Sequence, residues 1–222
     1  IGAPSLSELA KNAAKALILC DDSTRYTPAR HVAPHIVDEL RRGGIGDGGI
    51  SFLIGKGTHR AMSRAELEAK LGPDIVAAYP VEQHVHDDPS ELVTTGIVRG
   101  GVEFLVNRRL REYDLVVGIG NIIPHCIKGF SGGSNIVLPG VSGTDAIGAM
   151  HWLNLDCFGE KILGIRENIV RRLIDDVAEK AGLNYIVNTI VNNSLAVVDA
   201  VAGNPVEAHR EGASRASAVF TV

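Results

Sequence analysis

The feature that most constrains the fold is a set of short, almost wholly apolar runs separated by segments with helical periodicity. The clearest of these runs are Ala16–Cys20, Gly49–Ile54 and Tyr113–Gly120. Runs of this length and composition are typical of strands that are buried on both faces of a sheet. Because such strands alternate with helices here, the sequence predicts an α/β fold with a Rossmann-like, mostly parallel sheet flanked by helices.

Helix signals and turn signals fill the intervals between these strands. Ser63 and Glu66 form a capping box that should begin a helix ending near Leu71. A helix is also predicted over Pro28–Arg42, with Pro34 expected to kink or restart it. The other predicted elements are helices at 5–15, 145–153, 168–182 and 205–218, strands at 81–86, 185–191 and 195–201, and a hairpin of strands 91–98 and 102–106.

Composition excludes several classes of protein. The chain has 222 residues, 22 Lys and Arg against 26 Asp and Glu, and 45% apolar residues, which is a globular composition with a net charge of −4. Nucleic-acid binding needs clustered basic residues, and a membrane span needs a long apolar run, so we expect neither partner. Cys20, Cys126 and Cys157 lack CxxC spacing, which predicts buried, reduced thiols and a cytoplasmic location.

The length fits one large domain, residues 1–222. The chain begins at Ile1, and the segment 218–222 has the composition of a strand without a following turn. We therefore expect a fragment of a longer protein, in which residues after about 204 lead into a further, C-terminal domain.

Two loops that follow buried strands carry reactive side chains. The first, residues 21–28, contains Asp22, Thr24 and Arg25, and an arginine beside a helix start favours a planar anion. Capping by Thr27 or Ser23, with Arg25 neutralising Asp22, would explain the same residues. The second loop contains His59, either as a general base or as an ordinary surface histidine.

The segment 120–140 is the strongest functional signal. Its Gly129-Phe-Ser-Gly-Gly133 run can present backbone N–H groups as a nest for phosphate, and Pro124 fixes the approach to His125. The spacing matches neither a Walker loop nor the GxGxxG fingerprint of dinucleotide-binding folds. His151 follows in a predicted helix, where a partly buried structural histidine is the simpler interpretation.

Taken together, these segments resemble the lactate racemase family, whose members are 2-hydroxyacid racemases and epimerases that use a nickel-pincer nucleotide. The likeness covers nearly the whole chain and implies that it is the N-terminal, cofactor-holding domain of a two-domain protein. The segments that carry the likeness are Asp21-Asp-Ser-Thr-Arg25, Gly57-Thr-His-Arg60, Pro124-His125, Gly129-Phe-Ser-Gly-Gly133, Pro139-Gly140, His151 and Gly164-Ile-Arg-Glu-Asn168.

The resemblance implies a role for each matching residue. His59 and His125 fall on the two acid/base histidines, and His151 falls on the nickel ligand. Arg25 with Tyr26 would contact the substrate, a small 2-hydroxyacid. In the implied reaction, hydride passes from the substrate to the cofactor while a histidine takes the hydroxyl proton. The remaining implied contacts are with the cofactor and come from Asp22, Thr24, Arg25, Gly129, Ser131, Gly132, Gly133 and Asn135.

One position departs from the family pattern. The lysine that fixes the cofactor covalently should lie two residues after Gly133, where this chain has Asn135. An asparagine cannot form that link, so we expect any pincer cofactor to be bound non-covalently, or the activity to be lost. Lys128 is a substitute anchor in principle, although it lies on the other side of the glycine run.

Two alternatives from other functional classes remain open. His59, His84, His86 and His125 could form a zinc-dependent hydrolase site, since His84 and His86 would share one face of a strand. A non-catalytic module could instead capture a nucleotide or a sugar acid. Under the racemase interpretation, we expect the isolated fragment to be inactive, because residues of the C-terminal domain would close the site against water.

Overall fold

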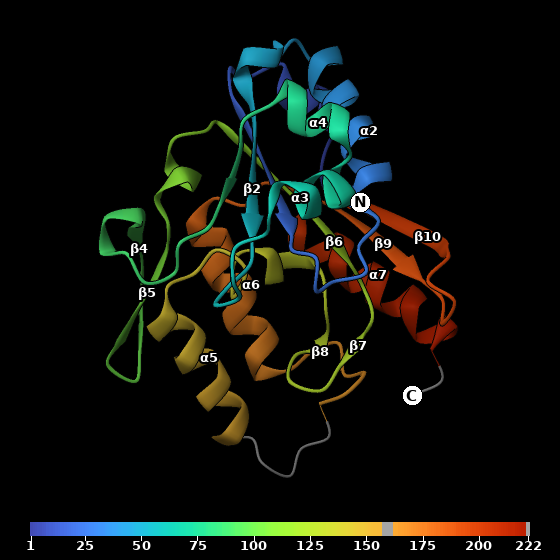
Figure 1. The fold of residues 1–222 in the computed structure, drawn as a ribbon. Helices are drawn as coiled ribbons and strands as arrows, with labels where there is room; N and C mark the ends of the chain where they lie inside the picture. The colour runs from blue at the N-terminus through green and yellow to red at the C-terminus, as the bar shows by residue number, and fades with distance from the viewer. Residues whose placement is uncertain (157–161, 221–222) are drawn as a thin grey trace.

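The structure, a computed structural model, describes residues 1–156 and 162–220, which fold around a central sheet with helices on both faces (Figure 1). The sheet has six strands in the order β10-β9-β6-β1-β2-β3. All neighbouring pairs are parallel except β9 and β10. The predicted Rossmann-like α/β fold is therefore confirmed. The strands are β1 (Ala16–Asp21), β2 (Ile50–Gly55), β3 (Val81–Gln83), β6 (Leu115–Asn121), β9 (Tyr185–Val191) and β10 (Val197–Gly203).

The apolar runs are explained by cores on both sides of this sheet. Successive side chains of a strand point to opposite faces. Accordingly, Ala16, Ile18 and Cys20 of β1 join one buried cluster, while Leu17 and Leu19 join another. Because both faces of β1 are buried, its sequence is continuously apolar from Ala16 to Cys20.

Helices and a hairpin cover the two faces of the sheet. The face of Ile18 is covered by α1 (Leu6–Ala10), α2 (Ala29–Arg42), α3 (Arg64–Leu71) and α4 (Pro73–Ala78). The face of Leu17 is covered by the hairpin β4 (Leu92–Arg99) and β5 (Val102–Asn107), by α5 (Thr144–Asp156) and by α6 (Ile169–Ala181). Helix α7 (Pro205–Val219) packs against β9 and β10, so the segment after residue 204 is part of this packed unit.

Several local predictions are confirmed by their geometry. Ser63 and Glu66 make both hydrogen bonds of the capping box at the start of α3. The β4–β5 hairpin turns at Gly100 and Gly101, whose φ values of 58° and 78° lie in the region that glycine adopts most easily.

Other local predictions are wrong. Helix α1 ends at Ala10 rather than Lys15, because the Asp114 carboxylate accepts hydrogen bonds from the amides of Ala14 and Lys15 and holds that segment outside the helix. Helix α2 is unbroken at Pro34, whose ring is exposed.

The prediction also missed some elements. It gave no indication of helix α4 or of the two-residue strands β7 (Pro124–His125) and β8 (Gly129–Phe130). Residues 218–219 belong to helix α7 rather than to a strand, and residues 221–222 lie outside the described residues. Cys20 is buried as expected, Cys126 is exposed, and Cys157 also lies outside the described residues.

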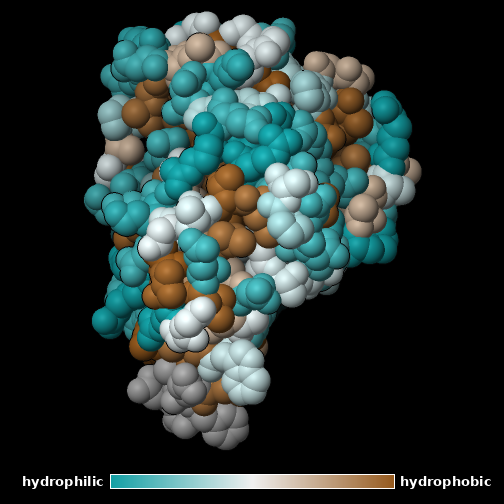
Figure 2. Space-filling view, turned by 90° about the vertical axis from the view of Figure 1, so that its left-hand side faces the viewer, coloured by the Kyte–Doolittle hydropathy of each residue, from teal (hydrophilic) through white to brown (hydrophobic). Residues whose placement is uncertain are grey.

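In the described ranges, no helix is both long enough and apolar enough to cross a bilayer. Figure 2 shows the side of the molecule that carries the β4–β5 hairpin and α5, where apolar patches are separated by polar and charged residues.

Candidate functional site

A cavity of about 540 Å³ opens at the carboxyl ends of β1, β2 and β6. The order of strands along the chain reverses between β1 and β6, and doubly wound sheets bind ligands at such a point. The loop after each of these strands contributes side chains, and α5 adds the apolar residues Ile147 and Met150. The predicted site residues that line this cavity are Asp22, Thr24, Arg25, Tyr26, His59, His125, Ser131, Gly132, Gly133, Asn135 and His151.

His59 forms a hydrogen-bonded pair with Asp22. Its Nδ1 lies 2.7 Å from Oδ2 of Asp22, whose side chain is almost fully buried. Thr24 donates to the other carboxylate oxygen through its hydroxyl at 2.6 Å. Burial acts to raise the pKa of Asp22, but the bonds from Thr24 and His59 outweigh it and lower that pKa. Because the ionised carboxylate only accepts, Nδ1 of His59 carries the proton and Nε2 is left as a base.

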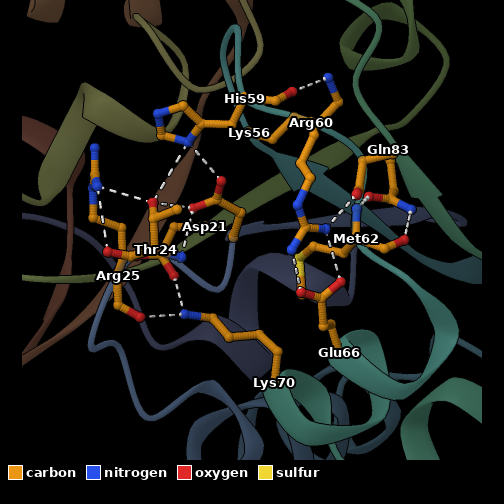
Figure 3. Close-up of polar contacts among 12 residues, drawn as sticks. Asp21, Thr24, Arg25, Lys56, His59, Arg60, Met62, Glu66, Lys70 and Gln83 are labelled. Atoms are coloured by element: carbon orange, nitrogen blue, oxygen red, sulfur yellow. Dashed lines mark hydrogen bonds and ion pairs between the residues drawn. The ribbon is translucent and has the colours of Figure 1, made fainter.

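A buried ion pair fixes the loop beneath His59 (Figure 3). Lys70 of α3 lies 2.6 Å from Oδ1 of Asp21 and donates to the Arg25 carbonyl oxygen at 3.0 Å. The Thr27 hydroxyl donates to the other Asp21 oxygen instead of capping α2. Arg25 donates to the Thr24 hydroxyl at 2.9 Å rather than pairing with Asp22. The capping interpretation of this loop is therefore wrong.

His125 lies in the loop after β6 and is half-buried. The Ile127 amide donates to its Nδ1 at 3.1 Å, so in the neutral ring the proton lies on Nε2. Burial, followed by the positive charges of Lys128 and Arg25, lowers the pKa of His125 to about 4. Of these two histidines, His59 therefore has a free Nε2 lone pair and His125 has an Nε2–H donor.

His151 projects from α5 into the same cavity. Its Nδ1 lies 2.8 Å from the Ile147 carbonyl oxygen, which can only accept, so Nδ1 donates and Nε2 keeps its lone pair. An exposed imidazole held in this tautomer can coordinate a metal through Nε2. The described residues hold no group of three His, Cys, Asp or Glu side chains that could share a metal ion. A metal at His151 would therefore need ligands from a bound cofactor.

The glycine-rich loop has fewer free amides than its sequence suggested. The Ser131 amide donates to the Ile123 carbonyl, and the Gly133 amide donates to Oδ1 of Asn188 at 2.6 Å. The Ser131 hydroxyl is also engaged, donating to the Asn121 carbonyl. Gly129 does not line the cavity, because its Cα faces the Ile165 carbonyl so closely that a Cβ would lie 1.8 Å from that oxygen.

Two buried helical residues brace this loop from behind. Arg171 of α6 is fully buried and donates to the carbonyls of Phe130 and Gly132. His209 of α7 lies with Nε2 3.0 Å from the Ser131 carbonyl. Since carbonyls only accept, both side chains act as donors to the loop backbone.

Two polar side chains in the cavity wall have little access to solvent and no bonding partner in the described parts of the chain. Both amide atoms of Asn135 are buried and unbonded within residues 1–156 and 162–220. The amine of Lys128, a residue only 7% exposed, makes no hydrogen bond or ion pair within those ranges. The family pattern drew attention to position 135, but nothing in the sequence indicated that Lys128 is buried.

The four-histidine zinc site is not assembled. His84 is fully buried, and its two ring nitrogens contact Asn107 Nδ2 at 3.1 Å and the Ser142 carbonyl at 2.9 Å. His86 bonds the Thr144 hydroxyl at 2.8 Å, and neither histidine lines the cavity. The predicted combination of these two histidines with His59 and His125 is therefore wrong.

The fold and the cavity define a doubly wound α/β domain with a ligand-sized opening at its switch point. The family described as "Lactate racemase N-terminal domain" matches residues 1–162. The chain therefore belongs to that family.

Individual relatives agree with this assignment. The lactate racemase of Thermoanaerobacterium thermosaccharolyticum is 31% identical over all of this chain and 52% of its own length. The lactate racemase of Lactiplantibacillus plantarum is 30% identical over 96% of this chain and 50% of its own length. The chain spans about half the length of these relatives.

Two solved structures also match. The lactate racemase apoprotein of T. thermosaccharolyticum superposes with a TM-score of 0.93 and covers the whole chain and 53% of the solved chain. A protein from Thermotoga maritima superposes with a TM-score of 0.80 at 25% identity, over 95% of this chain and 56% of the solved one.

Proposed function

We propose that this chain is the cofactor-binding half of a cytoplasmic 2-hydroxyacid racemase or epimerase, completed by a C-terminal domain. The observation that carries the proposal is that three imidazoles line one cavity and that Nδ1 of each has a different hydrogen-bond partner. These imidazoles belong to His59, His125 and His151. The match to lactate racemases supports the reaction class.

His59 is prepared to accept the proton of the substrate's hydroxyl group. Its Nε2 lone pair is free, and the buried Asp22 carboxylate stabilises the imidazolium that forms when the proton arrives. His125 is prepared to donate an Nε2–H bond to the same oxygen from another part of the cavity wall. A racemase must serve both enantiomers, so His125 must in turn act as the base, which requires its ring proton to move from Nε2 to Nδ1 in place of the contact with the Ile127 amide.

Arg25 and Tyr26 would orient the substrate. Both side chains are exposed at the mouth of the cavity, and Arg25 makes no ion pair in the described parts of the chain. A guanidinium that is free of carboxylate partners can bind the planar carboxylate of a 2-hydroxyacid through two parallel hydrogen bonds.

The residues of the cavity fit a nickel-pincer nucleotide. His151 would bind its metal through Nε2, which suits a cofactor that supplies the other donors. Asn135 offers an unbonded amide, and Asp22, Thr24 and Gly132 line the remaining wall. When bound, such a cofactor supplies the acceptor for the hydrogen on the substrate's C2.

Position 135 determines how that cofactor is held. An amide side chain can hydrogen bond to a ligand but cannot acylate or be acylated as an amine can. We therefore propose non-covalent binding. Denaturing mass spectrometry of the full-length, cofactor-loaded protein tests this directly, because a retained adduct would contradict it.

The function is tested with full-length protein co-expressed with cofactor-assembly enzymes and assayed on enantiopure 2-hydroxyacids by chiral chromatography. We expect racemisation of at least one acid, with retention of the C2 hydrogen in deuterated water, because the hydrogen leaves and returns without exchanging with solvent. His59→Gln and His125→Gln should each abolish turnover, whereas His31→Gln, on the exposed surface of α2, should not. Solvent deuterium at C2 would instead indicate a carbanion mechanism and contradict the proposal.

A further inference from the structure

We propose that Lys128 is the anion-binding residue of the cavity and that, with Arg25, it holds a carboxylate or phosphate group of the bound ligand. The inference deepens the proposed function, since it names the side chain that receives the negative charge of a substrate or cofactor. It depends on the position, burial and neighbours of Lys128, a residue to which the family pattern gives no role.

Lys128 is far more buried than an ordinary surface lysine. It follows the exposed Cys126 and precedes Gly129 of β8, yet it is only 7% exposed and lines the cavity. Within residues 1–156 and 162–220 its amine makes no hydrogen bond and no ion pair. The side chain is largely buried and the amine has no partner among those residues, a placement that disfavours its charged form unless a counter-charge arrives with a ligand.

The charges around Lys128 strengthen this argument. Those that act on its amine come from Arg171 of α6, Arg25 of the loop after β1, and the Cys126 thiol, and none of them is a carboxylate. The imidazole of His125 lies near the same amine, because the Lys128 charge lowers the pKa of His125. The wall on this side of the cavity is therefore positive.

The carboxylates of the cavity cannot neutralise this wall, because both are already engaged. Asp21 pairs with Lys70 and accepts from Thr27, and Asp22 pairs with His59 and accepts from Thr24. Burial and the neighbouring arginines lower the pKa of Lys128 to about 7. An anion bound beside the amine would favour its charged form, so binding should be accompanied by proton uptake.

Two backbone amides of the glycine-rich loop are already occupied. The amides of Ser131 and Gly133 donate to Ile123 and Asn188 within the protein. An ammonium group is a compact point charge that binds either a phosphate or a carboxylate. The site is therefore built from side chains and does not discriminate between these two anions by geometry.

Calorimetric titration of the full-length protein with inorganic phosphate and, separately, with oxalate tests the proposal. Lys128→Met should weaken binding of at least one anion by about tenfold or more, the loss of one charge-assisted contact. Lys128→Arg, which keeps the charge, should restore most of that affinity. Lys11→Met is the matched control, since Lys11 is exposed and does not line the cavity, and it should leave both affinities unchanged.

The two titrations distinguish the source of the anion. A loss confined to phosphate assigns Lys128 to a phosphate of the cofactor, and a loss confined to oxalate assigns it to the substrate's carboxylate. In the wild type, the binding enthalpy near pH 8 should depend on the ionisation enthalpy of the buffer, because a proton is taken up, and this dependence should vanish in Lys128→Met. A thermal melt of each variant checks that it is folded.

Two results would overturn the proposal. One is unchanged affinity for both anions in a folded Lys128→Met protein. The other is a covalent adduct on Lys128 in denatured, cofactor-loaded protein, since an acylated lysine carries no charge. A wild type that racemises no 2-hydroxyacid but still binds anions through Lys128 would contradict the proposed function. This inference about Lys128 would then still hold.

Discussion

The buried histidine His84 should make the stability of this domain fall as the pH is lowered. Its ring is fully buried between Asn107 and the Ser142 carbonyl, and this burial lowers its pKa from 6.5 to about 4. Between these two values the unfolded chain binds a proton that the folded chain does not. The free energy of unfolding is therefore unaffected by His84 above pH 6.5 and decreases as the pH falls from 6.5 toward 4.

The size of the effect follows from the two pKa values. Each pH unit within that interval costs about 1.4 kcal/mol, so His84 alone should remove about 3 kcal/mol of stability by pH 4. The half-buried His125, whose pKa is also lowered to about 4, adds to the slope in the same direction. A loss of this size is a large part of the stability of an ordinary domain.

Urea unfolding followed by far-ultraviolet circular dichroism, at several pH values between about 4.5 and 7.5, measures this slope. His84→Gln is the informative variant, because a glutamine amide can donate to Ser142 and accept from Asn107 without titrating. Its stability should fall less steeply than that of the wild type, and His31→Gln, on the exposed face of α2, should match the wild type. Equal slopes in wild type and His84→Gln would refute the reasoning.

Three further predictions concern the cavity and its supports. Asp22→Asn should lower kcat/KM of the full-length holoenzyme by about ten- to a hundredfold, because His59 loses a charge-assisted hydrogen bond. Chiral chromatography of the 2-hydroxyacid that the wild type racemises measures this, and unchanged kcat/KM would remove Asp22 from the mechanism. Arg171→Met should destabilise the domain by about 3 kcal/mol in urea unfolding, since it leaves two loop carbonyls without their donor and removes one of the two arginines beside the buried Asp175 carboxylate. A loss below about 1 kcal/mol would show that the bracing is weak. Asn135→Lys should create a covalent attachment point for the cofactor, which would be detected as an added mass in denatured, cofactor-loaded protein. If no mass is added, position 135 does not face the reactive group of the cofactor.

The sheet could be predicted from the sequence because burial on two faces leaves a local signal. Every residue of Ala16–Cys20 is apolar, and the turn residues Gly100 and Gly101 mark the hairpin without reference to distant parts of the chain. The ends of short helices were predicted less well. The end of α1 depends on Asp114, about a hundred residues away, and no local pattern contains that information.

The candidate site shows the same limit. Motifs identified the loops that carry His59 and His125, because each follows a strand with a strong local signature, and the helix that carries His151 was also predicted. The partners of those residues come from elsewhere in the chain, so the protonation states could not be predicted. The glycine run is a good example: its composition predicts free amides, and Asn188 of β9 occupies one of them.

The bracing of the glycine-rich loop by Arg171 and His209 has a consequence for protein engineering. Both side chains lie behind the cavity wall, on helices α6 and α7, and neither lines the cavity. A library restricted to wall positions would change residues of the loop itself, such as Ser131 and Gly132, but would leave both braces in place. Randomising the buried positions around Arg171 and His209 would instead vary the outline of the binding space while every residue in contact with the ligand keeps its identity.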